Sequence, residues 1–396
     1  MPLLEKIKSL SQAYCTEIVA LRRHLHANPE LSYQEYNTVK FVAQTLRTFG
    51  IESTEIASTG LLAEIRGKNP DKKTIALRAD MDALPITEAN DVPYKSKNSG
   101  VMHACGHDVH TSSLLGTAKI LNEIKDQFEG TVRFLFQPGE EKNPGGASYM
   151  IRDGALKNPA PSVILGQHVF PILPAGKIGF REGMYMASSD EIYLKVIGKG
   201  GHGAAPELTI DPIVIASHII IALQQVISRN ASPKQPTVLT FGKIAGGTAQ
   251  NIIPDVVTID GTFRAMNETW RAEGLKKIKT MAESIADGMG GKCEVNISHG
   301  YPYLENNPEV TRRIKKAAEE YVGKENVVDI EITLGSEDFA FYSHVVPASF
   351  YRLGTRNEAK GITSYVHTPT FDIDEDALAI GPGLMAWMAV NELRHP

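Results

Sequence analysis

The stretch TSSLLGTAKILNEIKDQFEGTVRFLFQ, residues 111–137, joins a segment of helical period to a short apolar segment. Apolar residues recur at helical spacing over 111–128, and TVRFLFQ at 131–137 has the composition of a buried strand. Strand-type segments also flank this stretch, with TIALRAD at 74–80 before it and SVILGQH at 162–168 after it. Strands that alternate with helices predict an α/β fold with a mostly parallel sheet. Ligand sites of such sheets lie beyond the carboxyl ends of the strands.

The rhythm of the sequence changes near residue 184. From there, strand-type and helix-type segments follow in the order βαββαβ, which is typical of a small ferredoxin-like domain. These segments are EIYLKVIG (191–198), DPIVIASHIIIALQQVISR (211–229), PTVLTFGKI (236–244), DVVTIDGTFR (255–264), ETWRAEGLKKIKTMAESIADG (268–288) and CEVNISH (293–299). The α/β rhythm then resumes up to a long helix predicted at 374–394. We therefore expect a small domain at 184–298, inserted into a larger domain formed by 1–183 and 299–396.

The composition of the chain is that of a globular protein of enzyme size. With 396 residues, of which 42% are hydrophobic, the chain is too long for one ordinary core, so two domains are expected. A net charge of -5 and the lack of a long basic run argue against a nucleic-acid partner. The first residues are charged throughout, unlike a secretory signal, and we expect no segment with the apolar length of a membrane span.

The cysteines indicate the compartment in which the protein works. Cys15, Cys105 and Cys293 are odd in number and far apart, so the sequence predicts no disulfide framework. Free thiols of this kind are usual in reducing compartments, and a cytoplasmic location is expected.

The motif GKGGHG at 198–203 matches the glycine pattern of dinucleotide-binding loops. In such loops a helix opens at once, whereas here AAPELTIDP at 204–212 places two prolines before helical period returns. The motif therefore does not predict a dinucleotide site.

The stretch MHACGHDVH at 102–110 concentrates ligand chemistry in a short segment. A structural zinc knuckle usually needs a C-x-x-C pair, which this sequence lacks. A cysteine–histidine nucleophile and one half of a catalytic metal site remain as alternatives. Cys105 and His107 are two positions apart, so in an extended segment both side chains would face the same way, and Gly106 would let the backbone approach an ion.

Further candidate ligands follow the other predicted strands. Because these strands are predicted to be parallel, their carboxyl ends should meet at one edge of the sheet, which favours the metal site. A thiolate together with imidazoles suits zinc, manganese, cobalt or nickel. The candidates are Asp80 and Asp82 in RADMD, Glu140 and Glu141 in QPGEE, His168 at the end of SVILGQH, and His367 in SYVHTPTF.

Motifs along nearly the whole chain resemble those of the aminoacylase/carboxypeptidase family of co-catalytic metallohydrolases. The resemblance is closest to the N-acyl-amino-acid amidohydrolase branch, which includes hippurate hydrolase and plant auxin-conjugate hydrolases. It extends from RRHLHANPELSYQE at 22–35 to the final helix. The motifs are RADMDALPI (78–86), HACGHDVH (103–110), QPGEE (137–141), HVFP (168–171), GKGGHGAAP (198–206), AQNIIPD (249–255) and GSEDFAFY (335–342).

The resemblance implies two divalent metal ions in each subunit. This chain departs from the family at large in two places, because Asp80-Met81-Asp82 replaces a His-x-Asp pair and Cys105 replaces the bridging carboxylate. The implied ligands are Cys105 for both ions, His107 and His168 for one ion, and Glu141 and His367 for the other.

The resemblance also assigns roles to acidic residues beside the ligands. Glu140 would be the general base, acting on hydroxide that the two cations stabilise. Asp82 and Asp108 would orient the ligand imidazoles. His103 stays open between a supporting and a structural role.

The inserted domain, in the family resembled, forms the dimer and a lid. It lends a histidine that helps to hold the oxyanion in the neighbouring subunit, and His202 matches that position. Asn251 and Arg264 match residues that bind the free carboxylate of the substrate, and an arginine fork suits this geometry. A homodimer, or a higher homo-oligomer, is therefore expected.

The resemblance thus implies an amidohydrolase that cleaves the amide bond of N-acyl-L-amino acids, releasing a carboxylic acid and a free amino acid. One alternative is a dipeptidase or carboxypeptidase of the same family. Another is a metal-binding relative without catalysis, although such a protein has no reason to retain Glu140 beside a ligand.

Overall fold

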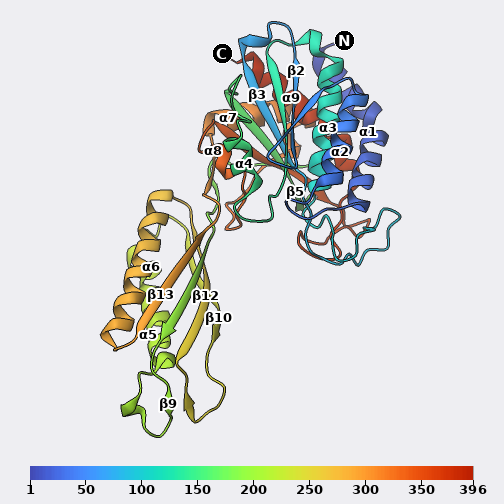
Figure 1. The fold of residues 1–396 in the computed structure, drawn as a ribbon. Coiled ribbons are helices and arrows are strands. Elements are labelled where there is room, and N and C mark those ends of the chain that lie inside the picture. The colour runs from blue at the N-terminus through green and yellow to red at the C-terminus, as the bar shows by residue number, and fades with distance from the viewer. Residues whose placement is uncertain (396) are drawn as a thin grey trace. The chain divides into compact units, whose positions relative to one another are not determined.

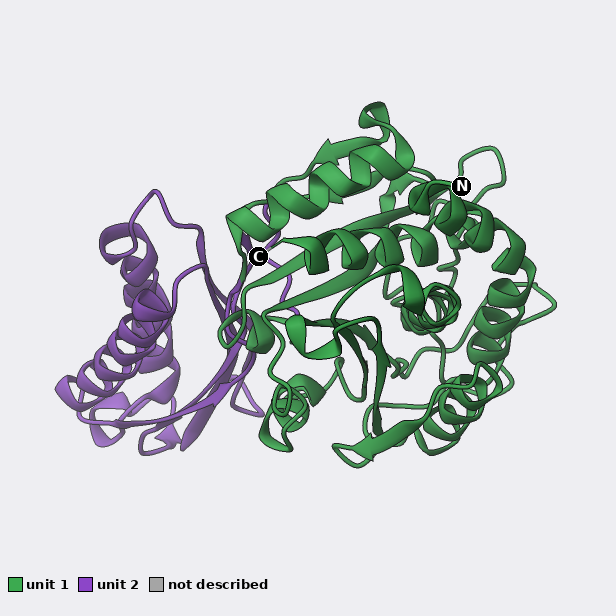
Figure 2. Cartoon of the chain, turned by 90° about the horizontal axis from the view of Figure 1, so that it is seen from above, with its two compact units in different colours: residues 1–183, 305–331, 338–396 green, residues 184–304, 332–337 purple. Residues whose placement is uncertain are grey.

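The computed structural model describes residues 1–395, which divide into two compact units (Figure 2). Unit 1 contains residues 1–183, 305–331 and the chain from Asp338 onward. Unit 2 contains residues 184–304 and 332–337. The chain therefore leaves the larger unit, builds most of the smaller one and returns, and it later adds residues 332–337 to the smaller unit.

Unit 1 is built around an eight-stranded sheet in the order β1-β2-β4-β3-β5-β16-β6-β15 (Figure 1). The central pairs β4–β3, β3–β5 and β5–β16 are parallel, as is β6–β15, whereas β1–β2, β2–β4 and β16–β6 are antiparallel. This arrangement confirms the predicted α/β fold with a mostly parallel sheet. The strands are β1 (Ser53–Ile56), β2 (Gly60–Arg66), β3 (Thr74–Asp80), β4 (Thr131–Gln137), β5 (Val163–Pro174), β6 (Ile178–Phe180), β15 (Val327–Asp329) and β16 (Ala348–Arg356).

The central strands are apolar because helices exclude water from both sides of them. All seven residues of β3 and all seven of β4 are buried, as expected for a sheet covered on both faces. Helices α3 and α9 pack against each other and both contact β3, while α4 contacts β4. The helices of unit 1 are α1 (Leu3–Ala27), α2 (Tyr36–Thr48), α3 (His107–Glu123), α4 (Gly146–Arg152), α7 (Pro308–Val322), α8 (Ala340–Ser343) and α9 (Gly381–Arg394).

The last predicted helix is shorter than its pattern indicated. Residues Glu375–Ala379 form a 3₁₀ turn, and the α-helix begins only at Gly381. Pro382 occupies the first turn of α9, where a missing backbone N–H costs nothing.

Unit 2 contains a four-stranded antiparallel sheet in the order β10-β12-β8-β13. Residues of β8 alternate between buried and exposed, so Ile192, Leu194 and Val196 face the core of the unit. Helices α5 and α6 pack against each other and against this sheet (Figure 1). In chain order the elements are β8 (Asp190–Ile197), α5 (Pro212–Gln225), β10 (Thr237–Ala245), β12 (Val256–Ala265), α6 (Glu268–Gly288) and β13 (Lys292–His299).

Helix α5 and the π turn that follows it (Val226–Asn230) contradict the expectation that no segment has the apolar length of a membrane span. The segment Pro212–Asn230 has 19 residues and a mean hydropathy of 1.4, which is long and apolar enough to cross a membrane by length and composition alone. Ile215, Ile219 and Leu223 are buried against the sheet of unit 2, as in a core helix of a globular domain. On the opposite side, Ile213 and Ile221 are exposed.

Candidate metal centre

The five implied ligands lie together in unit 1, in two groups that share one cysteine. The donor atoms of Cys105, His107 and His168 all lie within 4.8 Å of one another. The donor atoms of Cys105, Glu141 and His367 meet the same limit. The Sγ atom of Cys105 is 3.5 Å from Nε2 of His168, and Nε2 of His367 is 3.4 Å from Oε1 of Glu141.

The ends of parallel strands bring most of these residues to one edge of the sheet. Asp80 and Gln137 are paired in register at the last positions of β3 and β4, so the segments after them start side by side. Glu140 and Glu141 lie in the loop that leaves β4. His367 has a positive φ of 63°, and its backbone N–H donates to the carbonyl of Ala104 at 2.7 Å, next to Cys105.

Two local predictions about these ligands were wrong. Cys105 and His107 are not in one extended segment, because His107 is the first residue of α3 and Gly106 turns the chain with φ +80°. His168 does not end its strand, since β5 continues to Pro174. The continuation pairs with β16, where His168 lies beside Arg352 in register, and this pairing partner is distant in sequence.

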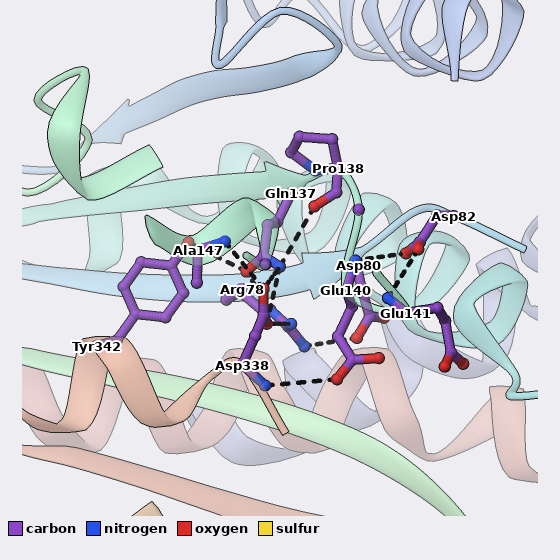
Figure 3. Close-up of polar contacts among 12 residues, drawn as sticks. Arg78, Asp80, Asp82, Gln137, Pro138, Glu140, Glu141, Ala147, Asp338 and Tyr342 are labelled. Carbon is purple, nitrogen blue, oxygen red and sulfur yellow. Dashed lines mark hydrogen bonds and ion pairs between the residues drawn. The ribbon is translucent and has the colours of Figure 1, made fainter. Parts of the chain in front are cut away.

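Asp82 holds the implied ligand His107 and the loop of the two glutamates at the same time. Its carboxylate lies 3.2 Å from Nδ1 of His107. It also accepts the backbone N–H groups of Glu140 and Glu141, each at 3.0 Å (Figure 3). The hydroxyl of Ser32 donates to the same carboxylate at 2.6 Å. The expected role of Asp82 in orienting an imidazole is therefore supported by these contacts.

The donor set fits divalent metal ions. Nδ1 of His168 lies 2.7 Å from the carbonyl of Val169, to which it donates, so its Nε2 presents a lone pair to the site. Nε2 of His107 is buried and has no hydrogen-bond partner among residues 1–395. Buried polar atoms without partners are rare unless a ligand satisfies them. Thiolate, imidazole and carboxylate donors together suit borderline metals such as zinc, manganese, cobalt or nickel.

The charges of the site also indicate a cation. Burial and the nearby Glu141 carboxylate raise the pKa of the Cys105 thiol. Contacts with Cys105 and Glu141 raise the pKa of His367 to about 10. Without metal the Cys105 thiol and the His367 imidazole therefore retain their protons, whereas a bound cation favours their deprotonated forms.

Asp108 does not orient a ligand imidazole, which corrects the prediction for this residue. Its Oδ2 atom accepts from Nε of Arg22 at 2.8 Å and lies 2.7 Å from Nδ1 of His26. Its Oδ1 atom has no hydrogen-bond partner among the described residues. Both partners belong to α1, and the pKa of Asp108 is held far below its usual range, mainly by Arg22 against the effect of burial. Asp108 therefore anchors α1 to α3.

Sequence reasoning missed His110, the last histidine of the MHACGHDVH stretch. Its Nδ1 lies 2.6 Å from the carboxylate of Asp80, and its Nε2 accepts the backbone N–H of Val169 at 2.9 Å. It thus connects the end of β3 to β5 beside His168. The spacing of His110 from His107, one helical turn apart, is a signal that places both on one face of α3. His103 is fully buried, and burial lowers its pKa to about 4.

The general base predicted at Glu140 is buried close to the ligands. Its carboxylate lies within 4.8 Å of the donor atoms of His107 and Glu141. Its Oε1 atom accepts the backbone N–H of Asp338 at 3.4 Å (Figure 3). A carboxylate held in this way is able to exchange a proton with a neighbouring water.

The residues predicted to bind substrate are in unit 2, where the structure brings two of the three together. His202 is in β9 (Gly201–His202), which pairs with β11 (Ile252–Ile253), directly after Asn251. Nδ1 of His202 accepts the backbone N–H of Ala204 at 3.0 Å, which leaves Nε2–H as a donor. Arg264 is in β12, where its guanidinium donates to Thr262 and Ser336, both at 3.1 Å.

Comparison with known proteins identifies the family. The profile of Peptidase family M20/M25/M40 matches residues 76–390. The chain belongs to this family. One relative is the N-acyl-L-amino acid amidohydrolase of Geobacillus stearothermophilus. It is 43% identical over 306 residues, which cover 77% of this chain and 82% of the relative. Thermostable carboxypeptidase 2 of Saccharolobus solfataricus is 42% identical over 395 residues, 99% of each protein.

The M20 fold is also evident from solved structures. A Bacillus subtilis protein described as a dinuclear metal binding peptidase from the M20 family superposes with a TM-score of 0.82 at 37% identity. The match covers 96% of this chain and 99% of that protein. The likeness therefore extends over both units of the chain.

Proposed function

We propose that this M20 family member is a metal-dependent amidohydrolase that cleaves N-acyl-L-amino acids into a carboxylic acid and a free amino acid. The observation that carries the proposal is the pair of donor groups sharing Cys105, with the buried carboxylate of Glu140 beside them. The names of relatives at similar identity support the same activity, among them the N-acyl-L-amino acid amidohydrolase of G. stearothermophilus and the N-acetylcysteine deacetylase of B. subtilis, which is 40% identical.

Each ligand has a proposed place in a site for two divalent ions. Cys105 serves both ions, His107 and His168 hold one, and Glu141 and His367 hold the other. When bound, two divalent cations polarise the scissile carbonyl and lower the pKa of water.

The side chains of the protein carry the proton transfers. Glu140 removes a proton from the attacking water at its carboxylate and returns it to the nitrogen of the departing amine. Asp82 fixes Glu140 and Glu141 through their backbone N–H groups, so base and ligand keep a constant relation to His107. The proton-accepting carboxylate is thereby oriented before the substrate arrives, which lowers the entropic part of the barrier.

Substrate recognition is proposed to use residues of two subunits. Asn251 and His202 lie at the two-stranded sheet of β9 and β11, and β12 is the next strand after β11 in the chain. Arg264 lies near the other end of β12. Eight steps of strand from Val256 to Arg264 span roughly 26 Å at about 3.3 Å per residue. One amino-acid carboxylate is far smaller than this, so Arg264 and Asn251 serve one substrate only if they come from different chains. His202 would then donate Nε2–H to the oxyanion in the neighbouring subunit.

Unit 2 has the surfaces that such a dimer needs. Strand β10 is an edge strand, whose outer backbone groups are free to pair with another strand. Helix α5 exposes Ile213, Val214 and Ile221. We propose that unit 2 forms a homodimer, or a higher homo-oligomer, while unit 1 performs catalysis. The three free cysteines support a cytoplasmic location.

A carboxypeptidase or dipeptidase activity is the second candidate, because a relative with 42% identity over 99% of the chain is named Thermostable carboxypeptidase 2. The two functions differ in the acyl group of the scissile bond, which is a simple carboxylic acyl group in one case and an aminoacyl group in the other. An assay of amine release should compare N-acetyl and N-benzoyl amino acids with dipeptides that have the same carboxyl-terminal residue. The protein should be loaded separately with zinc, manganese, cobalt and nickel, and its metal content should be measured.

We expect N-acyl amino acids to be cleaved with the larger kcat/KM. Faster cleavage of the matched dipeptides would instead establish the peptidase. A protein that binds two ions but releases no amine from either class would be a metal-binding relative without catalysis.

A further inference from the structure

Asp338, in the motif GSEDFAFY, has a buried carboxylate beneath the loop of the two glutamates (Figure 3). Its Oδ1 atom accepts from Nη2 of Arg78 at 2.6 Å and from Nε2 of Gln137 at 2.9 Å. Its Oδ2 atom accepts from Nε2 of Gln137 at 2.7 Å and from the backbone N–H of Ala147 at 2.9 Å. A carboxylate with this many donors is held in one orientation.

The partners of Asp338 are themselves fixed on different elements of unit 1. Arg78, in β3, donates through Nη1 to Asp80 at 2.5 Å and through Nε to Gln137 at 2.8 Å. Its guanidinium is fully buried between the carboxylates of Asp80 and Asp338, so the positive charge is compensated on both sides. Gln137, the last residue of β4, also accepts from the hydroxyl of Tyr342 at 3.1 Å. The network thus joins the ends of β3 and β4 to the segment that contains Asp338.

The backbone of Asp338 faces the general base. Its N–H is 3.4 Å from Oε1 of Glu140. Because the side chain of Asp338 is held by four hydrogen bonds, its N–H cannot turn away from Glu140 without breaking that network. On its other side, Glu140 is held through its own N–H by Asp82. Glu140 is therefore held at its backbone by Asp82 and at its carboxylate by the N–H of Asp338.

We propose that Asp338 is a positioning residue for Glu140: it holds a backbone donor against Oε1 and so directs the other carboxylate oxygen of the base toward the attacking water. This inference rests on the proposed role of Glu140 as general base. It gives the SED part of the motif a function in the reaction itself, beyond packing. Both carboxylate oxygens of Asp338 accept hydrogen bonds, so asparagine would have to place its NH₂ group at one of the two positions. There the NH₂ group would face the donors of Arg78 and Gln137, or those of Gln137 and Ala147.

The test is a double-mutant cycle of kcat between Asp338→Asn and Glu140→Gln in the metal-loaded protein. We expect Asp338→Asn to lower kcat by about 10- to 100-fold, the cost of a misplaced catalytic group, with KM and metal content unchanged. The double variant should then have the kcat of Glu140→Gln alone, since a base that is already absent cannot be misplaced. A purely structural role would lower kcat by the same factor in both backgrounds, and that result would overturn the proposal.

Two further variants separate folding from positioning. Glu392→Gln removes another buried carboxylate. This carboxylate pairs with Arg313 and with Lys73, the residue just before the start of β3. The variant should lower thermal stability but leave kcat unchanged. If Asp338→Asn does not fold, Gln137→Met takes its place, because it removes two hydrogen bonds to Asp338 and retains the ion pair with Arg78. Its loss of kcat should likewise vanish in the Glu140→Gln background, and an additive loss would contradict the inference.

If Glu140→Gln by itself has normal kcat, the proposed base fails, whatever Asp338→Asn does. If Glu140→Gln loses activity and Asp338→Asn has normal kcat, only the positioning role fails.

Discussion

The Sγ atom of Cys105 lies 3.5 Å from Nε2 of His168, although 63 positions separate the two residues in sequence. Cys105 precedes α3 and His168 belongs to β5, so the contact exists only when the helix packs on the sheet. The same sulfur lies within 4.8 Å of donors from Glu141 and His367. One sulfur atom is thereby common to both donor groups, and several of the following expectations depend on it.

The first prediction concerns this shared thiolate. Cys105→Ala should reduce metal content and activity together, since both proposed ions lose a ligand. In the unaltered protein, a thiol reagent should modify Cys105 faster in the metal-free form than in the loaded form, because a coordinated thiolate is shielded. Mass spectrometry of the modified peptide, with the more exposed Cys15 as an internal control, measures both rates. Equal rates at Cys105 in the two forms would count against coordination.

The second prediction concerns the base. Glu140→Gln should keep both metal ions, because no ligand is removed, but lower kcat by about 10²–10⁴-fold. Elemental analysis and steady-state kinetics on one N-acyl amino acid measure the two quantities. Glu141→Gln is the matched control, which should lose metal as well as activity. If Glu140→Gln loses metal and Glu141→Gln does not, the roles of the two glutamates are exchanged.

The third prediction concerns the subunit border. His202→Ala should retain its fold and metals but lose about 10²–10³-fold in turnover, the worth of one oxyanion donor. If His202 serves the neighbouring site, mixing His202→Ala with Glu140→Gln under subunit exchange should restore activity. One site of each mixed dimer then contains an intact base and an intact histidine, so recovery should reach at most about half of the unaltered protein. Formation of mixed dimers without any recovery would exclude the shared site.

The fourth prediction concerns Glu35, a buried carboxylate outside the ligand set. Burial, and then the charge of Asp82, raise the pKa of Glu35 to about 7, compared with 4.5 for a free glutamate. Its acceptor contacts are the N–H groups of Tyr33 and Gly139 and the hydroxyl of Thr59. The folded protein therefore binds this proton more tightly than the unfolded chain, and stability should fall as the pH rises between these two values.

Glu35→Gln cannot ionise and keeps an acceptor for the two N–H groups. Its Tm, compared with that of the unaltered protein, should therefore be relatively higher at pH 8 than at pH 5. Glu358→Gln at the surface is the control and should show no such trend. A Tm difference for Glu35→Gln that is constant from pH 5 to pH 8 would show that Glu35 ionises normally.

The sequence was sufficient for the fold of unit 1 and for the identity of the residues that gather at its sheet edge. Buried strands such as β3 and β4 have nearly continuous apolar composition. This composition can be recognised in the sequence without knowing which strands they pair with. Parallel strands end at the same edge, so Glu140 and Glu141 could be placed beside Asp80 from the order of elements. His168 was expected there as the end of a strand, although β5 continues past it.

The tertiary structure decided how each of these side chains is held. His107 starts a helix and His168 lies within a strand because Gly106 turns the chain and β16 extends the pairing of β5. Asp108 pairs with Arg22, 86 positions away, and Arg78 pairs with Asp338, 260 positions away. Periodicity and motif spacing report only local backbone geometry, whereas the partner of a buried charge is set by which distant element packs against it. For this protein, the sequence determined which residues gather at the edge of the sheet. The packing of distant elements determined which hydrogen bonds and ion pairs those residues form.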